Sequence, residues 1–240
     1  MEEKIKKNSE RVIWGILLTI IVFLISTFAG KNFSLNNKFI PDTFITNTLM
    51  LILSIGLIWG LRKHVNYKIS LPRFKKTLRP ILFGLLTAII VNVIMSIVEK
   101  TLGAETIESH SAHSAMSPLQ FFIFIFICTP IAEEVLFRGF LQNILKPFKI
   151  KGIKIFKKHV SVPVIISAIV FGLVHLIVII SGSGTLFVIR TVVFATTLGL
   201  IAGYYQEKYN NNGYAIIVHM AGNFLALAAV LLASSTNLSV

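Results

Sequence analysis

The sequence is poor in charge and nearly free of cysteine. Only 14% of its 240 residues are charged, and 10 acidic residues stand against 23 basic ones. Soluble domains average about 25% charged residues, so this composition, with 55% hydrophobic residues, excludes an ordinary soluble domain. It predicts a polytopic membrane protein. A single cysteine, Cys128, excludes an intrachain disulfide.

The formal net charge of +13 would suggest nucleic-acid binding in a soluble chain. Here the lysines and arginines lie in short segments between apolar runs, where contact with anionic lipid and control of topology explain them. We therefore expect the lipid bilayer as a partner and no nucleic acid.

Seven segments are apolar over the roughly 20 residues that a transmembrane helix needs. They are residues 12–30, 44–61, 80–98, 118–145, 162–180, 186–205 and 214–233. The fourth contains Pro130, whose missing N–H favours a kink or a division into two pieces, which would add an eighth element. We expect an all-α, polytopic membrane helix bundle of seven or eight helices that forms a single membrane domain.

Basic and non-basic connecting segments alternate along the chain. The basic ones are the N-terminus, the segment 62–79 and the segment 146–158. By the positive-inside rule this predicts a multi-pass cell-membrane protein with a cytoplasmic N-terminus and, after seven spans, a C-terminus outside. The apolar core of the first span is too long for a signal peptide, so we interpret it as a retained signal anchor.

Few ionisable residues lie inside these spans, and each is a functional-site hypothesis because its burial is costly. They are Glu133, Glu134, Arg138, His175, Arg190 and His219. Arg190 is near a helix end, so we expect it to extend to the lipid headgroups. Glu134 and Arg138 have the i, i+4 spacing of a helical ion pair. Glu133 has no such local partner, so its partner must come from another helix.

The polar residues available on other helices are His175, His219 and Asn223. Phe171 is one turn from His175, and Gly172 and Gly222 allow neighbouring helices to approach closely. Convergence of these groups with Glu133 would form a pocket in the cytoplasmic half of the membrane or near its midplane. Taken singly, each histidine or Asn223 could equally be a structural hydrogen-bonding group between helices.

A buried glutamate beside histidines has the properties of a general base. Glu133 and His175 would activate a water that attacks a peptide carbonyl, and His219 and Asn223 would stabilise the oxyanion. Cys128 has no cation beside it, which disfavours a thiol mechanism.

One carboxylate and two imidazoles also match the ligand count of catalytic zinc. The His-Glu-x-x-His motif is absent, so we favour a metal-independent site without a cofactor and keep zinc as the alternative. His110-Ser-Ala-His113 lies in a polar connecting segment, where we do not favour metal binding.

Three motifs in order carry a family resemblance: Glu133-Glu-Val-Leu-Phe-Arg138, Phe171-x-x-x-His175 and His219-x-x-x-Asn223. The chain resembles the CPBP family of CAAX prenyl proteases and bacteriocin-processing enzymes, also called the Abi family. The resemblance assigns a catalytic helix bundle to residues 118–240, and residues 1–117, with three spans and an outer loop, carry no signature. It implies that Glu133 and His175 activate water, that His219 and Asn223 form the oxyanion site, and that Glu134, Arg138 and Phe171 support them.

The leading hypothesis is an intramembrane glutamate endopeptidase that acts on a membrane-associated peptide or small protein. The composition is typical of a low-GC bacterium, in which the family serves peptide maturation, bacteriocin immunity and processing of surface proteins. A non-catalytic membrane scaffold or immunity protein of the same fold is the alternative. A transporter is third, because buried carboxylates also serve proton relays, but the sequence shows no inverted repeat.

Overall fold

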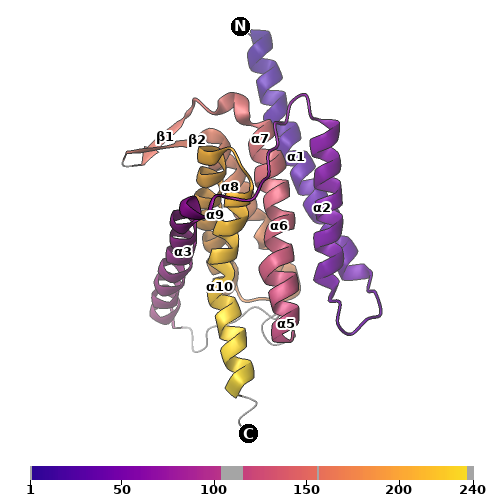
Figure 1. Ribbon diagram of the computed structural model, residues 1–240, viewed down its shortest axis with the longest axis vertical. Helices are drawn as coiled ribbons and strands as arrows, with labels where there is room; N and C mark the ends of the chain where they lie inside the picture. The colour runs from indigo at the N-terminus through magenta and orange to yellow at the C-terminus, as the bar shows by residue number, and fades with distance from the viewer. Residues whose placement is uncertain (1, 104–115, 156, 237–240) are drawn as a thin grey trace.

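The structure, a computed structural model, describes residues 2–103, 116–155 and 157–236. In this part of the chain seven helices are long and apolar enough to cross a membrane, which confirms the predicted all-α polytopic bundle (Figure 1). These spans are Ser9–Asn32, Asp42–Gly60, Phe74–Thr101, Pro118–Ile144, Val162–Ile180, Thr185–Tyr209 and Gly213–Thr236.

Five of the spans lie in simple helices, and two are composite. The simple ones are α1 (Glu2–Asn32), α2 (Asp42–Gly60), α3 (Phe74–Thr101), α9 (Thr185–Tyr209) and α10 (Gly213–Thr236). The fifth span is α8 (Val162–Val174), which tightens into a 3-10 segment, η4 (His175–Ser181). The fourth span consists of α5 (Pro118–Gln120), η1 (Phe121–Cys128), α6 (Thr129–Glu134), η2 (Val135–Leu141) and α7 (Gln142–Ile144).

Pro130 does not divide the fourth span, so no eighth element arises within it. The chain stays helical because wider π-helical turns, η1 and η2, precede and follow α6. At the end of η1 the N–H of Thr129 bonds to the carbonyl of Phe124, five residues back. π-Helical turns of this kind occur frequently at functional sites, and here they flank Glu133 and Glu134.

The two ends of the bundle differ in charge. One end, which we call the basic face, carries the N-terminus, the segment 61–73 and the antiparallel hairpin of β1 (Gly152–Ile155) and β2 (Lys158–Ser161), preceded by η3 (Lys146–Phe148). The opposite end, the non-basic face, carries the segment 33–41, α5 and the C-terminal end of α10. Figure 1 shows the N-terminus and the hairpin at the top and the C-terminal end with α5 at the bottom.

The fourth span lies at the centre of the bundle, and its half toward the basic face is packed most tightly. Residues 132–145 are all buried, and Phe137, Phe140 and Leu141 have no exposed surface. Small residues bring the helices that surround the site close together. A Cβ on Gly172 would overlap Thr196 Oγ1, and one on Gly84 would lie 2.5 Å from the carbonyl oxygen of Val218.

Candidate active site

The core of the site is a buried ion pair within the fourth span. Arg138 Nη1 donates to Glu134 Oε1 at 2.9 Å, and both side chains are almost completely excluded from solvent. The predicted i, i+4 pair is therefore confirmed. The guanidinium also lies over the ring of Phe171, 4.4 Å from its centroid. Gly199 of α9 makes room for it, because a Cβ there would come within 2.5 Å of Arg138 Nη2.

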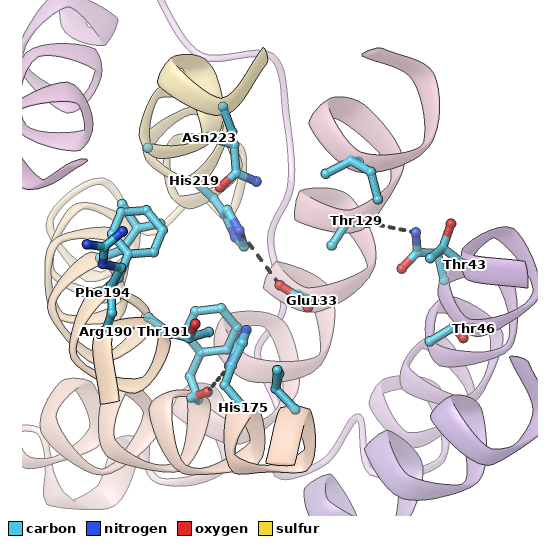
Figure 2. Close-up of a pocket in the computed structure, with 18 of the residues that line it drawn as sticks. Thr43, Thr46, Thr129, Glu133, His175, Arg190, Thr191, Phe194, His219 and Asn223 are labelled. Carbon is cyan, nitrogen blue, oxygen red and sulfur yellow. Dashed lines mark hydrogen bonds and ion pairs between the residues drawn. The ribbon is translucent and has the colours of Figure 1, made fainter. Parts of the chain in front are cut away.

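His219 of α10 connects the two glutamates. Its Nδ1 lies 2.9 Å from Glu134 Oε1, and its Nε2 lies 3.7 Å from Glu133 Oε2. An ionised carboxylate only accepts hydrogen bonds, so Nδ1 carries a proton and donates to Glu134. Figure 2 shows the His219 ring pointing at Glu133 across the space between α10 and α6.

This geometry adds a contact that the sequence did not predict. The sequence predicted Glu134 as the ion-pair partner of Arg138, and Glu133 with His175 as the residues that activate water. In the structure Glu134 also binds His219, and the imidazole nearest to Glu133 is that of His219. Sequence spacing could not show this, because Glu134 and His219 are 85 residues apart and meet only when α10 packs beside α6.

His175 stands at the start of η4, where α8 ends. Its Nδ1 lies 2.7 Å from the carbonyl oxygen of Phe171, one turn earlier. A carbonyl only accepts, so Nδ1 donates the proton and, in the neutral ring, Nε2 holds the free lone pair. His175 is half-buried and lines the same cavity as Glu133 (Figure 2).

The ring of Phe171 contacts the members of the site from three helices. It packs edge-on against His175 at 4.9 Å and against His219 at 5.7 Å between centroids, in addition to Arg138. Its own exposure is 1%. Phe171 therefore fixes the positions of both imidazoles through packing.

A cavity of about 390 Å³ lies beside these groups. Glu133, His175, His219 and Asn223 all line it, so the structure brings the four predicted catalytic residues together around one space. Leu198 and Gly222, where α9 and α10 are in close contact, complete this part of the wall.

The first two helices supply a wall that the sequence motifs did not reveal. Thr43, Thr46, Asn47 and Met50 of α2, with Phe23 and Thr27 of α1, line the cavity. The polar residues at 43, 46 and 47 recur at helical spacing in an otherwise apolar span, and that spacing was the available signal.

Asn47 joins this wall to the fourth span. Its Nδ2 donates to Thr129 Oγ1 at 2.9 Å and to the carbonyl oxygen of Phe124 at 3.3 Å. Thr129 Oγ1 donates to the same carbonyl at 2.9 Å. The π-helical end of η1 is thus held by a side chain of α2, one turn before Glu133.

Arg190 differs from its sequence interpretation. It forms an ion pair with Glu99 of α3 and donates to Ser96 Oγ at 3.3 Å, instead of extending to the headgroups. Its side chain has 13% exposure and also lines the cavity. Glu99 lies near the end of α3, and it can pair with Arg190 because α3 packs against α9.

The cavity also extends in an unexpected direction. Glu133 lies near the middle of its span, but the walls continue toward the non-basic face through Thr129, Ile125 and Phe121. Of the two expected positions, the cytoplasmic half or the region near the midplane, Glu133 occupies the second, and the cavity continues from there toward the non-basic face. Residues 132–145 are all buried, and none of residues 134–145 lines the cavity.

The structure also locates residues considered for a metal site and for a thiol mechanism. Among residues 2–103, 116–155 and 157–236, no group of three or more His, Cys, Asp or Glu side chains is arranged to hold a metal ion. Cys128 is a half-buried free thiol and does not line the cavity. His110 and His113 lie outside the described residues.

Comparison with known families identifies the region that forms the site. Residues 115–225 match the family model described as type II CAAX prenyl endopeptidase Rce1-like. This range contains Glu133, Arg138, His175, His219 and Asn223. No curated protein and no solved structure matches the chain.

Proposed function

We propose that this chain is a glutamate-type endopeptidase of the CPBP family of CAAX-type intramembrane proteases, because its residues 115–225 match the Rce1-like family model. It hydrolyses a peptide bond of a membrane-associated peptide or small protein without a metal cofactor. The observation that carries this proposal is the position of Glu133. Its Oε2 lies 3.7 Å from His219 Nε2, and it lines the same cavity as His175 and Asn223.

Glu133 is the general base of the proposed reaction. A water molecule in the cavity gives a proton to the Glu133 carboxylate, and its oxygen attacks the carbonyl carbon of the substrate. His175 orients the water by accepting a hydrogen bond at Nε2, because its Nδ1–H is occupied by the Phe171 carbonyl. The proton then passes from Glu133 to the leaving nitrogen as the C–N bond breaks.

The oxyanion is stabilised by His219 and Asn223. The Asn223 amide supplies a neutral N–H donor at the cavity wall. His219 donates to the oxyanion from Nε2 in the form in which both ring nitrogens carry a proton, while Nδ1 stays bonded to Glu134. Glu134 holds this ring in place through Nδ1, and Arg138 balances the charge of Glu134.

Glu133→Gln tests the proposal directly. The amide preserves the shape of the side chain but cannot take a proton from water, and loss of general-base catalysis costs about 10²–10⁴ in rate. We expect peptides that appear in cells with the wild-type chain to be lost in cells with Glu133→Gln, as measured by comparative peptidomics. Both proteins should accumulate equally in the membrane, because Glu133 makes no ion pair with Arg138.

The matched control is Asp42→Asn, which removes an exposed carboxylate at the start of α2 that does not line the cavity. It should leave the peptide pattern unchanged. Identical peptides in wild type and Glu133→Gln would instead favour the non-catalytic scaffold, since a scaffold needs folding but not the carboxylate.

A further inference from the structure

The cavity is confined to one half of the bundle. The first six spans each contribute residues to the cavity wall. In each span these residues lie near the middle of the helix or in the half closer to the non-basic face. These include Thr27 of α1, Thr46 of α2, Asn92 of α3, Ile125 of η1, Val178 of η4 and Thr191 of α9. On α10 the wall begins at His219 and continues to Ala226, again away from the basic face.

The other half of the bundle is closed. Beyond Glu133 and Glu134, Leu136, Phe137, Phe140 and Leu145 are completely buried. On the neighbouring helices, Ala168 of α8, Ala202 of α9 and Ala215 of α10 are also fully buried. These buried side chains fill the centre of the bundle between Glu134 and the basic face, where the cavity has no lining residues.

The open half is suited to a peptide backbone. An extended peptide inside the bilayer must find partners for its N–H and C=O groups, because lipid offers none. Hydroxyl and amide side chains lie along the wall at Thr27, Thr43, Thr46, Asn92 and Thr191. Thr27, Asn92 and Thr191 donate to carbonyls one turn back on their own helices, and their oxygen atoms can still accept a hydrogen bond from a peptide N–H. The hydroxyl of Thr43 is buried without a hydrogen-bond partner among the described residues.

We propose that the substrate enters from the non-basic face, as an extended peptide segment that crosses the cavity and brings its scissile bond to Glu133 near the middle of the bundle. With the basic loops in the cytoplasm, as the positive-inside rule predicts, entry is from the extracytoplasmic side. The substrates are then exported peptides or the outer membrane-embedded segments of small membrane proteins. This inference rests on the proposed function for the identity of the substrate, but the direction of entry follows from the cavity itself.

Cysteine accessibility tests the direction of entry without requiring catalysis. In a Cys128→Ser background, Thr46→Cys and Thr191→Cys each place one thiol in the cavity wall, on different helices. Ser34→Cys, in the exposed segment before α2, reports the non-basic face, and Lys154→Cys, exposed on β1, reports the basic face. Intact and permeabilised cells are treated with a charged, membrane-impermeant methanethiosulfonate, and modification is measured by mass.

We expect Thr46→Cys and Thr191→Cys to react equally in intact and permeabilised cells, like Ser34→Cys, whereas Lys154→Cys reacts only after permeabilisation. Reaction of the cavity cysteines only after permeabilisation, or in neither condition, would overturn the proposal. Glu133→Gln combined with Thr191→Cys should react like Thr191→Cys alone. A failure of the protease proposal therefore leaves this labelling result intact, and the two failures are distinguishable.

Modification should also block the site. Treatment of intact cells that carry Thr191→Cys should abolish the Glu133-dependent peptides, whereas treatment of cells that carry Ser34→Cys should not. Continued release of these peptides by fully modified Thr191→Cys would show that the substrate uses another route, and would also overturn the proposal.

Discussion

Glu134 Oε1 and His219 Nδ1 are 2.9 Å apart and join the fourth span to α10 inside the membrane. The same oxygen accepts a hydrogen bond from Arg138. Glu134 therefore has two functions, since it compensates a buried cation and holds the imidazole that faces Glu133. A glutamate doublet that spacing alone would divide into one structural and one catalytic residue is instead connected through His219.

The double function of Glu134 predicts that the two glutamates respond differently to the same substitution. Glu134→Gln leaves the guanidinium of Arg138 buried without a counter-charge, and breaking a buried pair in this way costs about 3–5 kcal/mol. We expect a strong fall in the membrane level of Glu134→Gln, measured by immunoblot, while Glu133→Gln accumulates normally.

Removing the charge of Arg138 as well separates stability from positioning. In Glu134→Gln/Arg138→Met no cation is left unpaired, so the protein should regain much of its wild-type level. Cleavage should stay low, because the amide in place of Glu134 binds the His219 ring less firmly than a carboxylate. Full recovery of cleavage in the double variant would show that Glu134 serves Arg138 alone.

Phe171→Leu tests the packing of the imidazoles. Leucine retains apolar volume but loses the ring faces and edges that contact His175, His219 and Arg138. We expect cleavage to fall at least tenfold, which corresponds to about 1.4 kcal/mol, with a smaller effect on protein level. Phe122→Leu is the matched control, because Phe122 is 41% exposed and lies outside the cavity wall. An equal response of the two variants would contradict the role of Phe171.

The bond between Asn47 and Thr129 predicts coupling between α2 and the fourth span. Asn47→Leu and Thr129→Val each remove one partner of the 2.9 Å hydrogen bond. Hydrogen bonds between transmembrane helices average about 0.6 kcal/mol, so the double variant should be more stable than the sum of the single effects by roughly that amount. The free energy of unfolding of each purified variant in detergent gives the double-mutant cycle. Strictly additive losses of stability in the two single variants would show that the hydrogen bond contributes nothing.

Gly199 should tolerate no side chain. A Cβ at this position would lie 2.5 Å from Arg138 Nη2, and the guanidinium is held by Glu134 and Phe171. Overpacking of this kind costs about 1–3 kcal/mol, so Gly199→Ala should lower the unfolding temperature and the cleavage rate together. Gly56→Ala on α2 is the control, because a Cβ there meets no atom within 4 Å.

Metal removal distinguishes a metal-independent glutamate mechanism from a zinc-dependent one, the two mechanisms that the sequence left open. If Glu133 activates water by itself, the initial cleavage rate of the purified enzyme should be unchanged after treatment with EDTA and 1,10-phenanthroline. A zinc-bound water would depend on the metal, so loss of activity that returns when Zn²⁺ is added would contradict the proposed mechanism.

The seven spans could be predicted because the bilayer requires long apolar helices, and that signal is present in each segment separately. The Glu134–Arg138 pair could be predicted for a related reason, since residues four apart on one helix are neighbours whatever the rest of the fold. The continuity of the helix through Pro130 could not, because it depends on π-helical turns and on the side chain of Asn47 from α2.

By itself the sequence determined the membrane class, the spans, the basic and non-basic ends, and four of the residues that line the cavity. Each of these depends on composition or on spacing along one helix. Only the tertiary structure decided that His219 faces Glu133, that Arg190 pairs with Glu99, and that the cavity extends away from the basic face. Those relationships depend on the rotation and depth of one helix against another, which are set by close packing at residues such as Gly84 and Gly172.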